Sequence, residues 1–413
     1  MASQAMQSGA LARPHERAPQ QRPIRLLTFS TLFPHAGRPN HGIFVENRLR
    51  HLLATGEATS TVVAPVPWFP SRSPRFGDWA RHAGADRSEV RDGLEIHHPR
   101  YALLPRMGMS AAPGALFLAG YAELRRLLRR GLEFDIIDAH YLYPDGVAAV
   151  ALGQALGRPV VVTARGSDVT QLPDHAIPGH MIRWAMSRAA GLISVSAGLR
   201  DAMLRLGAPP DSVTVLRNGV DLQLFRPIDR DAARRELGLD GPTLLSVGHL
   251  IPRKRHHLAI HALTRLPGWQ LVIVGEGPER SNLQQEAGTL GVAGRVRFAG
   301  SHPHTALPRF YSAADVMILA SSREGWANVL LEAMACGTPV VASNIPGNPE
   351  VVQGEAAGIV VSENTPDAFA QAILSVHTRA VPRRATRAYA EAFSWDATSA
   401  GQLELFRRVL AAA

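Results

Sequence analysis

Short apolar runs alternate with longer amphipathic stretches along almost the whole chain. Each run is four to six residues long and rich in Val, Ile or Leu, which is typical of buried strands. The runs occupy residues 24–29, 61–65, 134–138, 159–164, 191–195, 213–216, 243–248, 270–275, 296–300, 315–320, 339–343 and 358–361. Continuous apolar strands that alternate with helices need cover on both faces, so the pattern predicts parallel sheets with helices on either side.

The number of strands favours two domains over one. These twelve strands are too many for one small open sheet, and 413 residues suffice for about two to three domains. A single eightfold α/β barrel is the competing solution, but residues 222–243 have the composition of a linker before the next strand begins. The sequence therefore predicts two doubly wound Rossmann-like α/β domains, at 23–226 and 227–385.

Composition sets further limits. Residues 1–22 combine Arg, His, Pro and Gln without an apolar core, so they are predicted to form a disordered tail and not a signal peptide. The apolar stretch 107–120 is broken by Pro113 and is shorter than the roughly 20 residues that a membrane span needs. Cys336 is the only cysteine, which excludes an intramolecular disulfide and zinc sites with two cysteine ligands and favours a cytoplasmic location.

The net charge of +9 is distributed unevenly. Up to Pro227 there are 26 Arg and 18 acidic residues, a balance of +8, whereas the rest has 18 basic and 17 acidic residues, a balance of +1. The densest run, "RRLLRR" at 125–130, sets arginines beside leucines at helical spacing. It predicts either the solvated face of a helix or peripheral contact with an anionic membrane. Nucleic acid is not expected as a partner.

Ligands of open α/β sheets bind where loops leave the carboxyl ends of strands. The loop after the first strand, 30–42, contains no G-x-G-x-x-G, so the dinucleotide fingerprint is absent. Gly42 instead precedes a helix whose first amides would face an anion. A plain turn glycine is the alternative interpretation.

The stretch "SREGWANVLLEAMACGTPVVAS" at 322–343 is the most informative one. It predicts Glu324 in a loop and Glu332 about two turns into the helix that follows. Apolar residues surround Glu332 on nearly every side, and a buried carboxylate needs a partner, a role that ligand hydroxyl groups would fill. The backbone amides near Trp326, Ala327 and Asn328 are predicted to be free to hold a phosphate.

With this double-glutamate motif and the "GTPVVAS" and "PE" that follow it, the chain resembles the retaining GT-B glycosyltransferases of glycosyltransferase family 4, in particular those of bacterial cell-surface polysaccharides. The likeness covers nearly the whole chain after the tail. It includes the segments "DAHYLYPDG", "RGSD", "RNGVD", "VGHL", "VGEGPE", "FAG" and "FSW". It implies a GT-B fold, two Rossmann-like domains that face each other across a deep cleft. It also implies that residues 386–413, around Trp395, cross back to the first domain.

The resemblance assigns roles in binding a nucleotide-sugar donor, for which UDP is favoured over GDP. Glu332 would accept hydrogen bonds from the ribose hydroxyls, and Glu324 would contact the sugar hydroxyls. The backbone around Glu276 and Ala299 would read the base. The candidate substrate-binding positions also include Asp168, Asn218, Val329 and Leu330.

The same resemblance places Arg253 and Lys254 on the diphosphate, where Lys254 is the only lysine of the chain. His140 would approach the sugar as an orienting or weakly acid–base group, and Gly42 would bring its amide towards the phosphates.

Two positions depart from the family pattern. His249 stands where many relatives have arginine directly after the strand glycine, which leaves the phosphate charge to Arg253 and Lys254 unless His249 is protonated. Arg165 stands before "GSD", where histidine is common. A basic group in that loop suggests an acidic donor or acceptor.

No metal or cofactor is expected. A D-x-D occurs at 229–231, but it sits at a predicted helix start, where capping is the favoured interpretation, so transfer is predicted to be metal-independent. Family precedent implies retention, with the leaving phosphate helping to deprotonate the glycan or lipid-linked acceptor. Three alternatives are a nucleotide-sugar epimerase, a nicotinamide oxidoreductase, which lacks its fingerprint here, and a non-catalytic nucleotide- or nucleic-acid-binding module.

Overall fold

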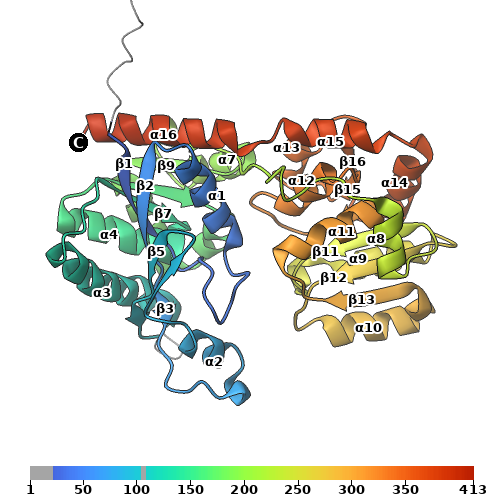
Figure 1. Ribbon diagram of the computed structural model, residues 1–413, viewed down its shortest axis with the longest axis horizontal. Helices are drawn as coiled ribbons and strands as arrows, with labels where there is room; N and C mark the ends of the chain where they lie inside the picture. The colour runs from blue at the N-terminus through green and yellow to red at the C-terminus, as the bar shows by residue number, and fades with distance from the viewer. Residues whose placement is uncertain (1–21, 104–107) are drawn as a thin grey trace, which may run out of the picture.

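The structure is a computed structural model that describes residues 22–103 and 108–413. It consists of two α/β halves side by side, and the C-terminal helix runs back across the first half (Figure 1). The N-terminal half comprises β1 to β10 and the C-terminal half comprises α8 to α15. The predicted disordered tail, apart from Arg22, lies outside the described residues.

The N-terminal half is built on a sheet with the strand order β10-β9-β8-β7-β1-β2-β5-β4. Its pairs are parallel except for β4–β5, which is antiparallel. The strands are β1 (Ile24–Phe29), β2 (Ala58–Val63), β4 (Ser88–Arg91), β5 (Leu94–His97), β7 (Ile136–His140), β8 (Val160–Ala164), β9 (Gly191–Ser194) and β10 (Val213–Val215). A separate pair joins β3 (Val66–Pro67) to β6 (Arg100–Tyr101).

Helices cover both faces of this sheet, as its almost entirely buried central strands require. On one face α3, α4 and α6 pack against each other, and on the other α1 packs against the C-terminal helix. The helices are α1 (Ile43–Ala54), α2 (Asp78–Ala83), α3 (Gly108–Arg129), α4 (Val147–Leu156), α5 (Ser167–Thr170), α6 (Ala176–Arg188) and α7 (Ala197–Arg205). Shorter turns are η1 (Pro74–Phe76), η2 (Leu142–Gly146), η3 (Leu172–Asp174) and η4 (Pro210–Ser212).

The basic run predicted from the sequence lies at the end of α3. Leu124 and Leu127 are buried in the core, whereas Arg125 and Arg129 are exposed on the outer side of the helix. Such an amphipathic helix is compatible with both interpretations of the run, a solvated face and a lipid contact. No helix within residues 22–103 and 108–413 has both the length and the apolar character to cross a bilayer.

The C-terminal half is built on an all-parallel sheet with the order β13-β12-β11-β14-β15-β16. The strands are β11 (Thr243–Val247), β12 (Gln270–Val274), β13 (Val296–Gly300), β14 (Val316–Leu319), β15 (Val340–Ala342) and β16 (Gly358–Val360). The helices are α8 (Arg230–Leu237), α9 (His256–Leu263), α10 (Arg280–Thr289), α11 (Leu307–Ala313), α12 (Asn328–Ala335), α13 (Asn348–Val351), α14 (Pro366–Arg379) and α15 (Arg383–Glu391), with turns η5 (Pro252–Lys254), η6 (Ala293–Arg295) and η7 (His304–Ala306).

Each of the twelve apolar runs overlaps a strand, but the sequence pattern did not reveal β3, β4, β5 and β6. These strands are two to four residues long, and β4 has no buried residue, so they carry little apolar signal. The expectation of purely parallel pairing is also wrong at β4. Asp92 and Gly93 have φ values of 48° and 79°, which is the backbone of a tight hairpin turn, and this Asp-Gly pair was the overlooked signal.

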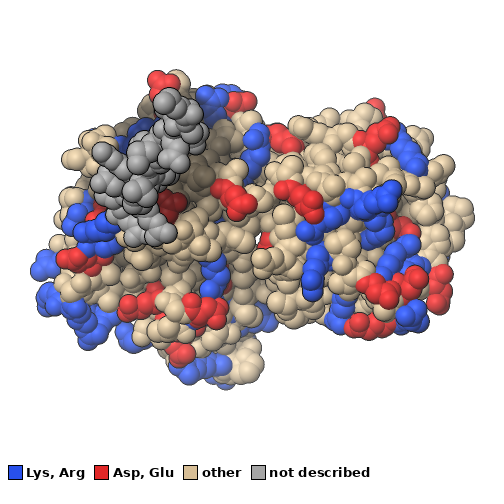
Figure 2. All heavy atoms as spheres, turned by 45° about the horizontal axis from the view of Figure 1, so that its top comes forward, with Lys and Arg blue, Asp and Glu red and all other residues tan. Residues whose placement is uncertain are grey.

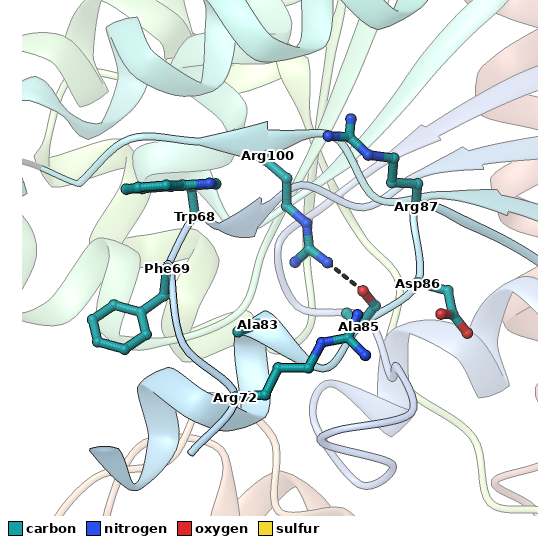
Figure 3. Close-up of a pocket in the computed structure, with 8 residues that line it drawn as sticks. All are labelled: Trp68, Phe69, Arg72, Ala83, Ala85, Asp86, Arg87 and Arg100. Atoms are coloured by element: carbon teal, nitrogen blue, oxygen red, sulfur yellow. Dashed lines mark hydrogen bonds between the residues drawn. The ribbon is translucent and has the colours of Figure 1, made fainter. Parts of the chain in front are cut away.

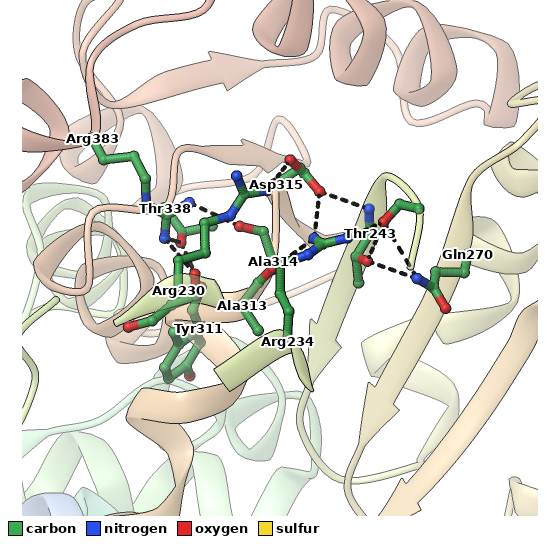
Figure 4. A network of polar contacts seen from close by, with 12 residues as sticks. Arg230, Arg234, Thr243, Gln270, Tyr311, Ala313, Ala314, Asp315, Thr338 and Arg383 are labelled. Atoms are coloured by element: carbon green, nitrogen blue, oxygen red, sulfur yellow. Dashed lines mark hydrogen bonds and ion pairs between the residues drawn. The ribbon is translucent and has the colours of Figure 1, made fainter. Parts of the chain in front are cut away.

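The stretch 222–243 read as a linker contains the helix α8, which is fixed to the C-terminal sheet by Asp315 (Figure 4). The Asp315 carboxylate pairs with Arg230, lies 3.3 Å from Arg234 Nη1 and accepts a 2.8 Å hydrogen bond from the amide of Thr243. The contacts join α8 to the first residue of β11 and to the residue before β14. The C-terminal half therefore begins before its first strand.

The C-terminal helix α16 (Trp395–Ala411) belongs structurally to the N-terminal half. Its Leu403, Leu405 and Phe406 are buried in one apolar cluster with residues of β1, β7, β8 and β9. Between α16 and α1, the fully buried Arg48 donates from Nε to Gln402 Oε1 at 2.9 Å and from Nη1 to the carbonyl of Leu216 at 3.1 Å. The last helix therefore completes the first core.

Candidate functional site

The carboxyl ends of the two sheets meet, and the glycine of the double-glutamate segment lies at the contact. A Cβ atom on Gly325 would stand 1.8 Å from the carbonyl oxygen of Arg165, and one on Gly166 would stand 3.1 Å from Gly325. Heavy atoms cannot approach to 1.8 Å, so this contact requires glycine at 325. The loops after β8 and β14 are thus in backbone contact.

Glu324, one residue before this contact, faces the cations of the loop after β11. Its Oε1 atom lies 2.5 Å from Lys254 Nζ, and its Oε2 atom lies 3.5 Å from Arg253 Nη1. The side chains of Glu324 and Lys254 are 10% and 12% exposed. Burial acts to raise the pKa of Glu324, but the charges of Lys254 and Arg253 outweigh it and lower the pKa. The carboxylate is therefore ionised and pairs with the only lysine.

His256 forms hydrogen bonds that hold the loop carrying Lys254. The His256 Nε2 atom lies 3.2 Å from the carbonyl of His249, and Nδ1 lies 2.9 Å from Ser246 Oγ. A carbonyl only accepts, so Nε2 carries the proton and Nδ1 accepts from the serine. Burial, followed by the charge of Lys254, lowers the pKa of His256 to about 4 although the bond to His249 opposes this shift. His256 is thus a neutral brace for the loop.

Glu332 has protein partners of its own. Its Oε2 atom accepts a 2.8 Å hydrogen bond from the Tyr311 hydroxyl, and its Oε1 atom lies 3.1 Å from His304 Nε2. Burial acts to lower the pKa of His304, but the hydrogen bond and charge of Glu332 raise it overall. The sequence reading missed both partners, because Tyr311 lies on α11, 21 residues away, and nothing in the spacing joins it to Glu332.

Two expectations for the start of α12 are wrong. The helix begins at Asn328, so Glu332 is its fifth residue and lies little more than one turn into it. The expectation of free amides is wrong only at Asn328, whose amide donates to the carbonyl of Trp326 at 3.2 Å; beyond it, the amide of Leu330 donates to Ala327 at 3.0 Å. Both changes follow from the irregular turn at 326–327. Trp326 and Ala327 are buried, and Val329 is partly buried.

In the N-terminal half, His140 is fully buried beneath Arg165. Its Nδ1 atom lies 2.8 Å from Arg165 Nη2, and its Nε2 atom lies 3.4 Å from Asp138 Oδ2. Burial, with the charge of Arg165, lowers the pKa of His140 to about 4 against the opposing charge of Asp138. The ring is therefore neutral at pH 7, with Nδ1 as the acceptor, and both ring nitrogens face side chains of the same half.

Arg165 joins the two halves through Asn218. Its Nη1 atom lies 3.1 Å from Asn218 Oδ1, and Asn218 Nδ2 lies 3.2 Å from Asn328 Oδ1 at the start of α12. The guanidinium carbon also lies 5.3 Å from the centre of the Phe44 ring. Burial, with the nearby charge of Arg48, lowers the pKa of Arg165 to about 9, so the side chain remains charged at pH 7.

Asp168 and Gly42 hold the local backbone. The fully buried Asp168 carboxylate accepts from the amides of Leu142 at 2.7 Å, Arg165 at 3.1 Å and Gly166 at 2.6 Å, so it fixes the loop that carries Arg165. Gly42 has a φ of 68°, and a Cβ there would stand 2.3 Å from the carbonyl of Leu32. The fold therefore accounts for both residues: Asp168 accepts from backbone amides, and Gly42 occupies a position where a side chain would not fit.

The predicted base-reading positions lie at the ends of β12 and β13. The carbonyl of Glu276 accepts from the amide of Leu250 at 3.0 Å, and its side chain pairs with Arg280. The carbonyl of Ala299 lies 3.1 Å from His302 Nε2. These residues stand at the same edge of the sheet as Lys254 and Glu324, at the ends of its strands.

Glu350 adds a contact between the halves to which the sequence reading gave no role. Its carboxylate accepts from the amides of Ala197 at 3.0 Å and Gly198 at 3.1 Å, the first residues of α7, and lies 2.7 Å from Arg217 Nη2. A carboxylate at a helix N-terminus satisfies free amides and complements the helix dipole. Glu350 in "PE" therefore caps a helix of the opposite half.

The D-x-D pair is a helix cap in the structure. The carboxylate of Asp229 accepts from the amide of Ala232 at 3.0 Å at the start of α8. Among the described residues no group of three or more His, Cys, Asp or Glu side chains could hold a metal ion.

Two family sequence models together match most of the chain. The sequence model for Glycosyltransferase Family 4 matches residues 55–224, and that for Glycosyl transferases group 1 matches residues 229–393. Two similar proteins are named D-inositol 3-phosphate glycosyltransferase. The one from Saccharomonospora viridis is 33% identical over 68% of this chain and 71% of its own length, and the one from Acidothermus cellulolyticus is 35% identical over 67% and 68%.

Solved structures agree on the fold. Sucrose-phosphate synthase from Thermosynechococcus elongatus superposes with a TM-score of 0.75 at 22% identity and covers 95% of this chain and 100% of its own. HepE from Anabaena, solved in complex with UDP-glucose, superposes with a TM-score of 0.68 at 19% identity over 93% and 99%. The two halves therefore form a GT-B fold.

Replacing His256 by Gln is expected to destabilise the protein by about 1–3 kcal/mol at pH 7.5, and this deficit should shrink as the pH falls. The folded-state pKa of about 4 lies below the ordinary value of 6.5. The stability that neutral His256 supplies is therefore complete above pH 6.5 and is lost as the pH falls through 4, whereas Gln does not titrate. Urea unfolding followed by circular dichroism at several pH values measures the deficit. His180→Gln, at an exposed position on α6, is the control; a His256→Gln deficit that is constant with pH would contradict the assignment.

Proposed function

The chain belongs to glycosyltransferase family 4, and from that premise we propose that it transfers a sugar from a nucleoside-diphosphate sugar to a glycan or lipid-linked acceptor. The observation that carries the proposal is the contact of Glu324 with Lys254 and Arg253 at the carboxyl ends of β14 and β11. A carboxylate suits sugar hydroxyls, and two adjacent cations suit a diphosphate. The sugar and the diphosphate are the two parts of such a donor.

The chemistry asked of these residues is to break the bond between the anomeric carbon and the diphosphate. Negative charge grows on the leaving phosphate in the transition state, so cations held against it stabilise that state more than the ground state. Glu324 holds the Lys254 ammonium in place, and the hydrogen bond of His256 to the carbonyl of His249 holds the loop that carries it. Little reorganisation is then needed as the bond breaks.

The base and ribose subsites complete the donor proposal. We assign the ribose hydroxyls to Glu332, which would exchange its bond with His304 or Tyr311 for them, and the base to the backbone near Glu276 and Ala299. UDP is the favoured nucleotide, and the structural similarity to HepE, which was solved in complex with UDP-glucose, supports this choice. The proposed location of the enzyme is the cytoplasm.

Transfer is proposed to be metal-independent and to retain the anomeric configuration. The capping role of Asp229 supports the first part, since it occupies the only D-x-D of the sequence. His140, neutral and held by Arg165 and Asp138, is proposed to position the Arg165 loop and not to exchange protons with the substrate.

The acceptor is proposed to be a component of cell-surface polysaccharide. The named relatives point to a phosphorylated polyol as a second acceptor class, because they are D-inositol 3-phosphate glycosyltransferases. Figure 2 shows basic side chains gathered at the outer end of the N-terminal half. The exposed arginines of α3 are in line with contact of this half with an anionic membrane that carries a lipid-linked acceptor.

Replacing Glu324 by Gln is expected to lower donor turnover by about 10²–10⁴-fold, because the contact with the sugar and the anchor of Lys254 are both weakened. Release of UDP from UDP-sugars, assayed in EDTA, measures turnover, and circular dichroism checks the fold. The matched control is Glu363→Gln, which changes an exposed glutamate of the same half and should leave turnover unchanged. Wild-type turnover in Glu324→Gln would sink the assignment, and an epimerised UDP-sugar formed without acceptor would favour an epimerase.

Replacing Lys254 by Arg is expected to lower turnover by about tenfold or more although the charge is kept. The ammonium is a compact charge in a largely buried position beside Glu324, and the larger planar guanidinium does not fit it in the same way. Steady-state UDP release measures the loss. Arg255→Lys, the reverse exchange at the next residue, should have little effect. An unimpaired Lys254→Arg enzyme would show that charge alone suffices there.

The membrane proposal predicts binding to anionic vesicles at low salt. Vesicles with about 30% phosphatidylglycerol should retain the protein in sedimentation assays, and the triple change of Arg125, Arg129 and Arg130 to Gln should reduce retention several-fold. The matched control changes Arg235, Arg379 and Arg384, three exposed arginines of the C-terminal half. Equal retention on neutral and anionic vesicles would refute the contact.

A further inference from the structure

The segment between β3 and β6 forms a pocket outside the residues described so far. The pocket has a volume of about 330 Å³ and is lined mainly by Trp68, Phe69, Arg72, Arg87 and Arg100 (Figure 3). Ligand pockets range upward from about 300 Å³, so this one suits a molecule of about one ring. It collects three guanidinium groups and two aromatic rings on one small surface.

The three arginines face one carboxylate, Asp86, which also lines the pocket. The half-buried Arg100 donates to the carbonyls of His82 and Ala85, and Figure 3 shows Arg72 directed towards the same loop. Arg72 and Arg87 are exposed, and neither forms an ion pair with another described residue. The pKa of Arg100 is lowered by burial and by the charges of Arg87 and Arg72, with only Asp86 acting against them. Like charges in contact favour a bound anion.

The two aromatic residues of the pocket are held in place by contacts with other parts of the chain. Trp68 is 58% exposed, yet its backbone amide donates to the carbonyl of Tyr101 at 2.8 Å, which anchors it beside β6. Phe69 packs against Phe76 and Trp79, with ring centres 5.2 and 5.6 Å apart. An exposed indole next to cations is the arrangement that takes a sugar ring and its charged substituent together.

The pocket adjoins the loop between β1 and α1. A Cβ on Gly37 would stand 2.1 Å from the carbonyl of Arg81, and Arg38 Nη1 lies 3.3 Å from His82 Nε2. The same loop carries His41, whose pKa is lowered to about 4 by burial, followed by the charge of Arg38. The helix after this loop carries Phe44, whose ring centre lies 5.3 Å from the guanidinium carbon of Arg165, near the contact of the two halves. The loop thus links the pocket to that contact.

We propose that this pocket binds a sugar phosphate, with the phosphate among Arg72, Arg87 and Arg100 and the ring against Trp68. Planar guanidinium groups bind phosphate oxygens through paired N–H donors, which accounts for three arginines at one site. The ligand is a phosphorylated sugar unit of the acceptor, held away from the reacting hydroxyl. This identification of its source rests on the proposed function, whereas the binding itself does not.

Titration calorimetry with glucose 6-phosphate as the probe tests the pocket. The full chain is saturated with UDP, so that the cations near Glu324 are occupied. Wild type is expected to bind with a Kd of about 1 mM or tighter, and Arg72→Gln/Arg87→Gln should bind about tenfold more weakly or worse. Arg75→Gln/Arg81→Gln removes the same charge from residues that do not line the pocket and should bind as wild type does.

The role of Trp68 has its own readout. Trp68→Ala should weaken binding of glucose 6-phosphate but leave binding of inorganic phosphate unchanged, because only the ring contact is lost. If wild type and Arg72→Gln/Arg87→Gln bound glucose 6-phosphate with equal affinity, the proposal would be overturned. It would also be overturned if wild type did not bind glucose 6-phosphate but was retained on anionic vesicles. The UDP titration of wild type is read separately: its failure would contradict the proposed donor, while the outcome at the pocket would stand.

Discussion

The approach of Gly325 to Arg165 fixes the geometry on which the remaining site depends. Because the two backbones touch where a side chain would not fit, the carboxyl ends of β8 and β14 are held at one distance. Two flanking contacts, Asn218 with Asn328 and Glu350 with the start of α7, oppose rotation about that point. Each of the three contacts joins a residue of the N-terminal half to one of the C-terminal half. Arg165 and Glu324 flank the contact directly, so the distance between them follows from it.

Several cations lie around this contact. Arg48 is buried and Arg165 is partly buried, and with pKa values of about 10 and about 9 both remain charged at pH 7. Lys254 and Arg253 approach from the other sheet, where Glu324 offsets part of their charge. Buried histidines such as His140 and His256 are neutral and serve as hydrogen-bonding groups. Arg48 and Arg165 thus carry charge at pH 7, whereas His140 and His256 act only as uncharged hydrogen-bonding groups.

Sequence reasoning predicted the buried strands and their parallel pairing well, and the side-chain contacts between distant elements poorly. Apolar β-branched runs identify buried strands, and the loops after them identify the edge where Glu324, Lys254 and Arg165 lie. The start of α12 was misplaced because its N-cap is Ala327, which has no capping side chain to signal a boundary. The contact of Tyr311 with Glu332 and the cap that Glu350 forms depend on tertiary packing, which leaves no local pattern. The arginines and tryptophan of the pocket are likewise scattered over 33 residues, and the β3–β6 pairing together with the bonds of Arg100 to the carbonyls of His82 and Ala85 brings them together.

The position of α16 has a consequence for how the protein is made. Leu403, Leu405 and Phe406 complete an apolar cluster that otherwise consists mostly of residues from the first 220 positions. The ribosome makes this helix only after the whole C-terminal half, so part of the N-terminal sheet stays uncovered while that half is translated. A nascent chain in that condition exposes apolar surface, which favours aggregation until α16 can pack. Synthesis of α16, and not of the junction between the halves, therefore completes the core of the N-terminal half.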